Sequence, residues 1–353
     1  MTDEFDYELS DELVAKSGAE PRDSARLLVD GGERVDHLHI ADIPDLVGPG
    51  DVVVVNDSRV LHSRLRFHRP TGGASELLLL EEIEPGRWEA LAKPSGKMRS
   101  GECYDIAPGL SVTMGADLGD GRREITVEAD APIEQLLDRL GDVPLPPYLG
   151  DVVLADDERY QTVYSDRASS AAAPTAGLHF TQELLDEVES AGAEIETVEL
   201  TIGLSTFRPI ATDSIDEHRM HSERYEIEPA AWDRIVAARR VIAVGTTSVR
   251  ALESAALTGA LSGRTDLFIR RGFEFRVVDV LMTNFHLPRS SLLVMIDAFV
   301  GPRWRELYEI AMGERYRFLS FGDAMWLTRL RNGLPGLTHG ESRGPISRTG
   351  GVA

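Results

Sequence analysis

The sequence predicts an α/β protein, a mixed sheet flanked by helices, into which a small all-β barrel is inserted. Three observations favour this fold class: an uninterrupted apolar run at 51–55, short apolar stretches separated by Gly- and Pro-rich turns at 61–127, and alternating strands and helices from about residue 181. A chain of 353 residues corresponds to about two domains. Its 42% hydrophobic and 27% charged residues are near the values typical of globular proteins.

The first part of the chain contains the predicted barrel. The run DVVVV at 51–55 predicts a buried strand that ends in a loop at Asn56. Apolar stretches at 76–80, 88–92, 111–114 and 124–127 predict barrel strands, and a short helix at 132–140 follows them. The stiff connector PLPPY at 144–148 marks a boundary. We therefore expect an α/β catalytic domain at 1–60 and 146–331, with the barrel domain at 61–145.

The second part of the chain alternates strands and helices. Thr181 is expected to cap a helix that ends at Ser190, before Gly192. Further helices are expected at 231–240, 248–256 and 303–312, and strands at 196–202, 241–244, 267–269, 275–281 and 292–296. The last residues, 332–353, are rich in Gly, Ser and Pro and are expected to form a disordered tail.

Composition excludes several classes of protein. A single cysteine, Cys103, permits neither an intramolecular disulfide nor a thiolate metal cluster, as is typical of a reducing cytosol. The first residues are acidic and lack the apolar core of a signal peptide. No stretch reaches about 18 apolar residues, so no membrane-spanning helix is expected. We expect a cytoplasmic protein without a membrane partner.

The charge of the chain is unevenly distributed. The net charge of −22 opposes a general coating of nucleic acid. Residues 234–331, however, contain 15 Arg, no Lys and 9 acidic residues, whereas the rest of the chain has 22 basic and 50 acidic residues. This local surplus of arginine is consistent with a phosphate-facing surface, or with ordinary pairing of surface arginines in a chain that prefers Arg to Lys.

The segment VIAVGTTSVR at 241–250 gives the clearest physical signal of a binding site. A buried strand leads into a small hydroxylated turn at the start of a helix, where free N–H groups favour an anion. Gly245 allows close backbone approach, Thr246 and Thr247 offer hydroxyls, and Arg250 offers a guanidinium. The alternative is a capped helix that binds nothing.

Two further segments contain candidate proton-transfer groups. In AAPTAGLHF at 172–180, small residues including Thr175 and Gly177 leave room beside His179, whose imidazole is either a general base or structural. In TNFHLP at 283–288, a strand end presents Asn284 and His286 to the edge where open α/β sheets bind ligands, unless the turn is satisfied internally.

A metal site is a further alternative for the histidines. His218 and His221 are three positions apart and precede Glu223. With His179 and His286 they would form a metallohydrolase site, but the chain has no HExxH motif. Otherwise they are surface histidines that cap or pair with Glu223.

Taken together and in order, these motifs identify a family. The chain resembles the S-adenosylmethionine:tRNA ribosyltransferase-isomerases, which form epoxyqueuosine in queuosine biosynthesis. The resemblance runs from FDYEL (5–9) to YRFLSFGDAM (316–325) and includes PGDVVVVNDSRV (49–60), LPPYL (145–149), ERYQTVYS (158–165), AAPTAGLHF (172–180), MHSE (220–223), VGTTSVRALES (244–254) and TNFHLPRS (283–290). It covers nearly all of the chain except the tail.

The resemblance implies a reaction. S-adenosylmethionine would give its ribosyl moiety to the aminomethyl group of a 7-deazaguanine at the tRNA wobble position, with release of adenine and methionine and without a metal. A base must remove the 5′ proton that the sulfonium acidifies, and a second acceptor must keep the attacking amine neutral. We expect a monomer whose partners are S-adenosylmethionine and the modified tRNA.

Motif position and side-chain chemistry suggest roles for individual residues in this reaction. His179 and His286 are the candidates for proton transfer, with Glu223 as an alternative acceptor, and Asp323 would orient a histidine or bind the amine. The expected cosubstrate site consists of Thr175, Gly177, Gly245, Thr246, Thr247, Arg250 and Asn284.

Several positions depart from the family pattern. They include Ser205 in place of a glycine, Arg270-Arg271 before Gly272, and Asp297 in place of a serine. Ser205 and Asp297 keep one alternative open, a divergent paralogue that uses S-adenosylmethionine with another amine acceptor. The other alternative is a non-catalytic RNA-binding module, against which the retained His179, His286, Glu223 and Asn284 argue.

Overall fold

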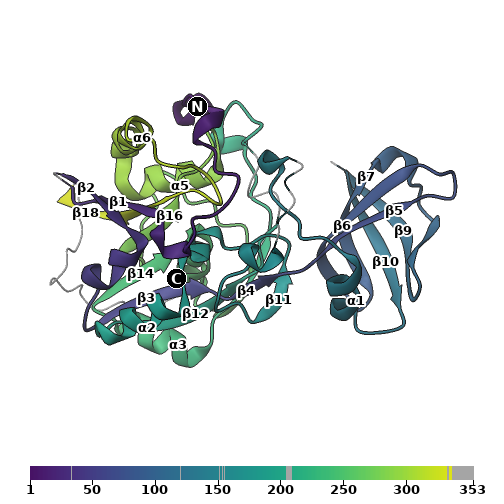
Figure 1. The fold of residues 1–353 in the computed structure, drawn as a ribbon, viewed down its shortest axis with the longest axis horizontal. Coiled ribbons are helices and arrows are strands. Elements are labelled where there is room, and N and C mark those ends of the chain that lie inside the picture. The colour runs from purple at the N-terminus through teal and green to yellow at the C-terminus, as the bar shows by residue number, and fades with distance from the viewer. Residues whose placement is uncertain are drawn as a thin grey trace, which may run out of the picture.

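The computed structural model describes residues 1–32, 34–119, 121–150, 152, 154, 156–203, 209–331 and 334–335. Two β-structures lie side by side along the long axis of the molecule, a large sheet covered by helices and a small barrel (Figure 1). In the described part of the chain, no helix combines the length and the apolar composition that a membrane crossing requires.

The large sheet has nine strands and mixed direction. Its order is β15 (Ser262–Thr265), β13 (Glu223–Glu226), β12 (Glu194–Leu200), β3 (Asp51–Asn56), β14 (Arg240–Val244), β16 (Val280–Asn284), β17 (Ala324–Thr328), β1 (Arg26–Asp30) and β2 (Val35–His39). The central strands β12, β3, β14 and β16 are parallel, so their carboxyl ends share one edge. All residues of β3 are buried, as is typical of a parallel strand covered on both faces.

Helices cover both faces of this sheet. One face packs against α3 (Pro229–Ala237), α4 (Thr246–Thr258), α5 (Ser291–Val300) and α6 (Trp304–Gly313), and the other against α2 (Gln182–Ser190). The alternating residues of β3 divide accordingly, with Val52 and Val54 in the first core and Val53 and Val55 in the second. The hydroxyl of Thr181 caps α2 by accepting from the N–H of Leu184, as predicted.

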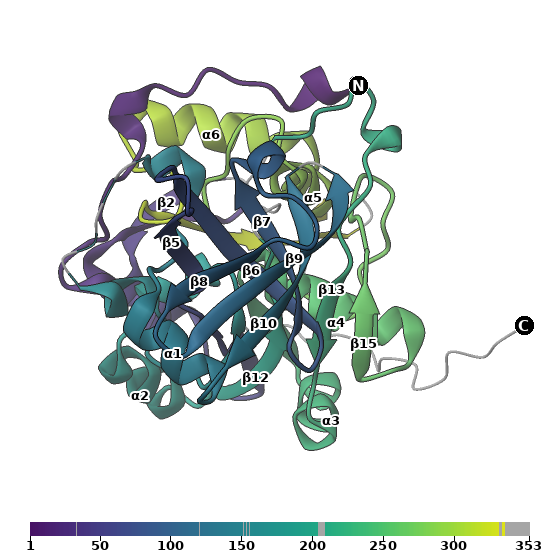
Figure 2. The ribbon, with the colours of Figure 1, turned by 90° about the vertical axis from the view of Figure 1, so that its right-hand side faces the viewer.

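The barrel is a six-stranded antiparallel sheet that faces the viewer in Figure 2. Its order is β5 (Arg64–His68), β6 (Ala74–Glu84), β7 (Arg87–Lys93), β10 (Arg122–Ala129), β9 (Leu110–Gly119) and β8 (Cys103–Ala107), with α1 (Ile133–Leu140) beside it. The edge strands meet where the rings of Phe67 and Tyr104 lie 5.4 Å apart, so the barrel is nearly closed. The predicted fold class is confirmed, while the predicted domain boundaries stay predictions.

Short elements connect these parts. Two strands, β4 (Ser58–Val60) and β11 (Arg167–Ser170), form a small parallel ladder between the sheet and the barrel (Figure 1). The 3₁₀ helices are η1 (Thr2–Phe5), η2 (Asp11–Leu13), η3 (Arg22–Ser24), η4 (Ile40–Leu46), η5 (Ser95–Lys97), η6 (Pro147–Leu149), η7 (Asp157–Tyr160), η8 (Thr175–His179), η10 (Ile215–Glu217) and η11 (Gly301–Arg303). A last hairpin pairs β18 (Leu330–Arg331) with β19 (Leu334–Pro335). The rest of the predicted tail lies outside the described residues.

The strand predicted at 292–296 is wrong, because these residues belong to α5. Ser290 caps this helix by accepting from the N–H of Leu293. Nearly every residue of α5 is buried, so the segment has no polar face to distinguish a helix from a strand.

Other element boundaries also differ from the prediction. The helix predicted at 231–240 ends at Ala237, and Arg240 begins β14, where its guanidinium pairs with Asp51 at 2.6 Å. Residues 267–269 do not form the predicted strand. The strand in this region is β15, which ends at Thr265. The strand predicted at 275–281 is β16, which begins at Val280, and the helix predicted from Ser248 begins at Thr246.

Candidate active site

A partly open pocket lies at the carboxyl edge of the parallel strands. Its lining comes from separate parts of the chain: residues 173–176 at the start of η8, 245–247 at the start of α4, 283–287 at the end of β16, and Tyr148 and Ser320. This edge is where open α/β sheets bind ligands. The pocket brings together six predicted site residues, Thr175, Gly245, Thr246, Thr247, Asn284 and His286.

The turn from β14 into α4 forms one side of the pocket. Gly245 has a φ of 89°, a left-handed conformation that glycine adopts without strain, and donates its N–H to the carbonyl of Met282. Because α4 begins directly after Gly245, Thr246 and Thr247 occupy its first turn rather than a preceding loop. The pocket therefore faces the N-terminus of a helix, as the sequence predicts.

Asn284 connects the pocket to His179. Its side-chain oxygen accepts from the hydroxyl of Thr175 at 3.0 Å, and its amide donates to Nε2 of His179 at 3.1 Å. His179 lies behind Asn284 rather than in the main pocket, in a smaller cavity lined also by Arg22, Arg159 and Ser320. Ser320 lines both cavities, so the two are neighbours.

Both candidate histidines are buried and neutral at pH 7. Burial lowers the pKa of His179 to about 4, against a smaller opposing effect of the Asp323 carboxylate. Burial lowers the pKa of His286 to about 3. A neutral imidazole can accept a proton, so either ring is in the protonation state of a general base.

His286 is the histidine that lines the pocket. Its Nε2 lies 2.9 Å from the hydroxyl of Thr283, and its backbone N–H donates to the hydroxyl of Tyr308 at 3.0 Å. Its carbonyl accepts from the hydroxyl of Tyr7, a residue of the N-terminal segment. These contacts fix the ring and backbone of His286 relative to the end of β16.

Asp323 lies outside the pocket lining and binds backbone groups. Its carboxylate accepts from the N–H groups of Arg26 at 3.1 Å and Arg317 at 2.8 Å. Its carbonyl lies 3.5 Å from the amide nitrogen of Asn284. Asp323 therefore fixes the loop that follows α6 next to Asn284 and His179.

Glu223 and Arg250 form a buried ion pair away from the pocket lining. Arg250 also donates to the carbonyls of Leu267 at 3.2 Å and Thr265 at 3.3 Å, and Glu223 accepts from the N–H of Gly203 at 3.1 Å. Burial lowers the pKa of Arg250 to about 10. The pair connects α4 to strands β13 and β15 at the edge of the sheet.

Most arginines of residues 234–331 form ion pairs with acidic residues of the same chain. Twelve of the fifteen form ion pairs: Arg234, Arg239, Arg240, Arg250, Arg264, Arg270, Arg271, Arg289, Arg303, Arg315, Arg317 and Arg329. This pairing favours the second alternative from the sequence, in which the surplus neutralises acidic residues of the same chain.

The histidines considered as metal ligands do not assemble. The ring of His218 packs against Phe268 with centroids 5.2 Å apart. Among the described residues, no group of three or more His, Cys, Asp or Glu side chains is placed to hold a metal ion.

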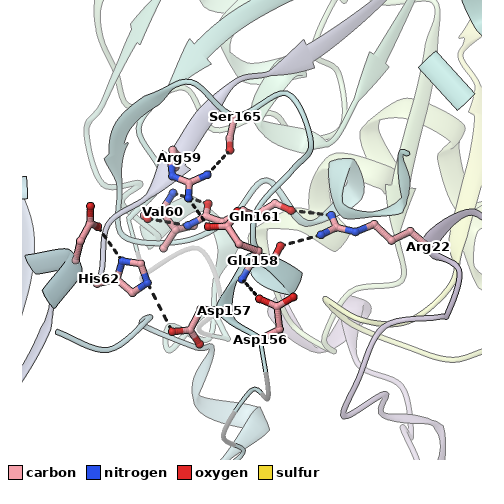
Figure 3. A network of polar contacts seen from close by, with 10 residues as sticks. Arg22, Arg59, Val60, His62, Asp156, Asp157, Glu158, Gln161 and Ser165 are labelled. Atoms are coloured by element: carbon pink, nitrogen blue, oxygen red, sulfur yellow. Dashed lines mark hydrogen bonds and ion pairs between the residues drawn. The ribbon is translucent and has the colours of Figure 1, made fainter. Parts of the chain in front are cut away.

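A polar network supports the segment that contains His179 (Figure 3). Arg22 donates to the carbonyls of Gln161 at 2.7 Å, Glu158 at 2.7 Å and Leu178 at 3.4 Å. The side chain of Gln161 pairs with both backbone groups of Val60 at 2.9 Å. The network thus joins the N-terminal segment, β4, η7 and the residue before His179.

The sequence alone did not assign chemistry to Tyr148, Ser320 or Tyr7. The hydroxyls of Tyr148 and Ser320 bond to each other at the pocket wall, and Tyr7 contacts the backbone of His286. All three residues stand in the motifs that carry the family resemblance, so those motifs could have pointed to them as site residues. Their partners are 172 and 279 residues away, and only the fold brings them together.

Comparisons with known proteins show the family of this chain. A family model described as "Queuosine biosynthesis protein" matches residues 2–327. An S-adenosylmethionine:tRNA ribosyltransferase-isomerase from Rubrobacter xylanophilus is 48% identical over 329 residues, which are 92% of this chain and 97% of the relative. The chain belongs to the S-adenosylmethionine:tRNA ribosyltransferase-isomerase family.

Further relatives of this ribosyltransferase-isomerase family support the assignment. The enzyme of that name from Anaeromyxobacter sp. is 47% identical over 343 residues, covering 92% of this chain and 98% of the relative. The crystal structure of an S-adenosylmethionine tRNA ribosyltransferase from Thermotoga maritima matches with a TM-score of 0.52 and 34% identity, covering 92% of this chain and 99% of that one. The family and the enzyme class predicted from the motifs, a transferase of queuosine biosynthesis, are confirmed.

Proposed function

We propose that the pocket binds S-adenosylmethionine and transfers its ribosyl moiety to 7-aminomethyl-7-deazaguanine at the wobble position of tRNA, giving epoxyqueuosine-tRNA, adenine and methionine. One observation carries this proposal. The pocket gathers residues from five family motifs, at 145–149, 172–180, 244–254, 283–290 and 316–325, around one buried neutral histidine. The site needs no metal in this proposal, because proton transfer and positioning suffice.

His286 is the general base of the proposed reaction. The sulfonium acidifies the 5′ C–H of the cosubstrate, and the neutral His286 imidazole in the pocket accepts that proton while adenine departs. The aminomethyl group of the tRNA base then attacks the 5′ carbon and loses a proton to a second acceptor, and the bond between the 5′ carbon and the sulfur breaks to release methionine. Glu223 stays a prediction for that acceptor, and its ion pair with Arg250 supports a structural role instead.

The other predicted residues position the reactants. Thr175 and Asn284 contact the cosubstrate from the pocket wall, and His179 holds the amide of Asn284 from behind. Asp323 fixes the neighbouring loop, and Gly177 allows η8 to pack closely on Tyr164. Arg250 acts on the site through α4 and not by contact with the cosubstrate. Such positioning supplies much of the rate of a two-substrate reaction.

We propose that the protein acts as a cytoplasmic monomer on its tRNA. Light scattering of the protein with and without the tRNA tests the oligomeric state, and a mass of one chain per tRNA is expected. A stable dimer in both samples would contradict it.

Release of adenine tests the function. The protein is incubated with S-adenosylmethionine and either tRNA that carries the aminomethyl-deazaguanine or the same tRNA with guanine at that position. We expect adenine and methionine in equal amounts with the first tRNA only. Adenine released with neither tRNA, despite binding of S-adenosylmethionine, would favour another acceptor.

A pair of variants tests the roles of the histidines. H286Q should reduce adenine release by about 10²-fold or more, because the base is lost. H179Q should reduce it less, because its side-chain amide can still accept from Asn284. Equal losses in both variants, with unchanged stability, would contradict the assignment of His286 as the base.

A further inference from the structure

Thr247 has a buried hydroxyl without a partner. The residue is only 7% exposed and lines the pocket, yet its Oγ1 has no hydrogen-bond partner among the residues that the structure describes. The next residue, Ser248, also has a buried hydroxyl, but its Oγ donates to the carbonyl of Val244 at 2.8 Å. Because a buried polar group without a partner is costly, the Thr247 hydroxyl is placed to bind a ligand.

Backbone donors surround this hydroxyl. No side chain caps α4, and the N–H groups of Thr246 and Thr247 have no acceptor within the helix. The helix is 13 residues long, and its N-terminus bears a partial positive charge. A hydroxyl and two N–H groups in one turn form a site for a small anion.

The rest of the pocket limits which anion fits. Among the described residues, no Arg, Lys, Asp or Glu lines the pocket, and the histidine that lines it, His286, is neutral at pH 7. A tRNA phosphate belongs to a polyanion that proteins neutralise with Lys and Arg. The methionyl end of S-adenosylmethionine instead has an ammonium group beside its carboxylate, so it needs no basic side chain from the protein.

We propose that the α-carboxylate of S-adenosylmethionine binds at the N-terminus of α4, where it accepts from the Thr247 hydroxyl and from the N–H groups of Thr246 and Thr247. This inference rests on the proposed function. It orients the cosubstrate: the methionyl end lies at the end of β14, and the sulfonium and ribose extend towards Asn284 and His286 at the end of the neighbouring strand β16. The 5′ carbon then faces the proposed base.

The test compares S-adenosylmethionine with decarboxylated S-adenosylmethionine, which keeps the sulfonium, ribose, adenine and ammonium groups. We expect the wild-type enzyme to prefer the carboxylated cosubstrate by about tenfold or more in kcat/KM for adenine release on the modified tRNA. T247V should reduce this preference severalfold by weakening the reaction of S-adenosylmethionine alone. T247S restores a hydroxyl and should restore the preference.

The matched control is S248A, which removes the neighbouring hydroxyl that is bound to Val244 and should leave the preference unchanged. A T247V enzyme that loses the same factor with both cosubstrates, or a wild-type enzyme that does not distinguish them, would overturn the inference. Weaker tRNA binding by T247V, with an unchanged cosubstrate preference, would mean that the turn binds a tRNA phosphate.

Calorimetric binding of the two cosubstrates separates this inference from the proposed function. If S-adenosylmethionine binds more tightly than its decarboxylated form, this difference depends on Thr247, and no adenine is released, then the carboxylate site is supported and the proposed reaction is contradicted. Adenine release without discrimination would preserve the reaction and contradict the carboxylate site. If neither cosubstrate binds, both proposals fail.

Discussion

The side-chain amide of Asn284 donates to Nε2 of His179 across 3.1 Å, between two segments that are 105 residues apart. An imidazole nitrogen that accepts a hydrogen bond is unprotonated, so the neutral ring has its proton on Nδ1. The contact therefore fixes both the tautomer of His179 and the orientation of the Asn284 amide at the pocket wall.

Replacing Asn284 by Asp should invert this contact. A carboxylate beside Nε2 favours the charged imidazole, so N284D should raise the pKa of His179 by at least about one unit. Adenine release at pH 7 should fall by about 10²-fold, because the amide at the pocket wall is lost. NMR titration of His179 and kcat/KM are the measurements. The control is T175V, which removes only the hydroxyl bound to Asn284 and should leave the pKa of His179 unchanged. If the pKa of His179 is also unchanged in N284D, the proposed role of the Asn284 amide is contradicted.

The two buried histidines should make the protein less stable in acid. Their folded-state pKa values, about 4 for His179 and about 3 for His286, lie below the value of 6.5 for a free histidine. Between pH 6.5 and 4 the unfolded chain therefore binds more protons, and stability falls as the pH falls. Each histidine contributes about 1.4 kcal/mol per pH unit in this window.

Denaturant unfolding at pH 7, 6 and 5 measures this dependence. H179Q and H286Q should each have a shallower loss of stability below pH 6.5 than the wild type, and the double variant should have the shallowest. Parallel curves for the wild type and both variants would show that neither histidine is held neutral by folding.

Gly177 should not tolerate a side chain. A Cβ on this residue would lie 1.9 Å from the hydroxyl oxygen of Tyr164 and 2.9 Å from the methyl carbon of Thr162. G177A should therefore cost about 1–3 kcal/mol and lower adenine release by displacing η8. The Tyr164 hydroxyl is buried without a hydrogen-bond partner, so Y164F alone should be nearly neutral.

The double variant G177A/Y164F tests this explanation. Removing the Tyr164 hydroxyl relieves the closest contact, and part of the lost stability and activity should return, measured by thermal unfolding and adenine release. Additive effects of the two substitutions would mean that Gly177 is required for another reason.

The ion pair between Glu223 and Arg250 should contribute to stability more than to catalysis. E223Q leaves the buried Arg250 charge without its carboxylate and should cost about 3–5 kcal/mol of unfolding free energy. The kcat of the folded enzyme should stay within a few-fold of wild type, because neither residue lines the pocket. D36N, which breaks the exposed pair with Arg34, should cost less than about 1 kcal/mol. A 10²-fold loss of kcat at unchanged stability would instead identify Glu223 as a proton acceptor.

Two departures from the family pattern pair with each other. Arg271 contacts the buried Asp297 carboxylate at 2.7 Å, and the indole N–H of Trp304 donates to the same oxygen at 3.2 Å. Neither Arg271 nor Asp297 lines the pocket. The presence of these two residues in place of those of the family pattern therefore does not require a different amine acceptor. Ser205, the other departure, lies outside the described residues.

R271A should cost more than the double variant R271A/D297S. Alone, it leaves a buried carboxylate without its cation, at about 1–3 kcal/mol, while the double variant removes the charge as well. Adenine release should be unchanged in the double variant. If the double variant unfolds as easily as R271A or loses activity, the pair is not the reason for these departures.

The sequence determined the family and the fold class, and it singled out six of the residues that line the pocket. Motifs such as VGTTSVR and TNFHLP stand at strand ends, and the carboxyl ends of parallel strands share one edge, so Gly245 and Asn284 had to lie near each other. The sequence could not separate the helix α5 from a strand, because a segment buried on all sides has no periodic polar face.

Only the tertiary structure decided where the candidate residues lie relative to the pocket. His179 and His286 look equivalent in the sequence, yet one lies behind Asn284 and the other lines the pocket. From the sequence, Glu223 is a candidate proton acceptor and Arg250 a candidate cosubstrate-binding residue, yet the two pair with each other across 27 residues. Whether a candidate residue can reach a ligand depends on whether its side chain lines the pocket and on which charged group it contacts. Packing between distant segments sets both, and no local pattern of residues contains that information.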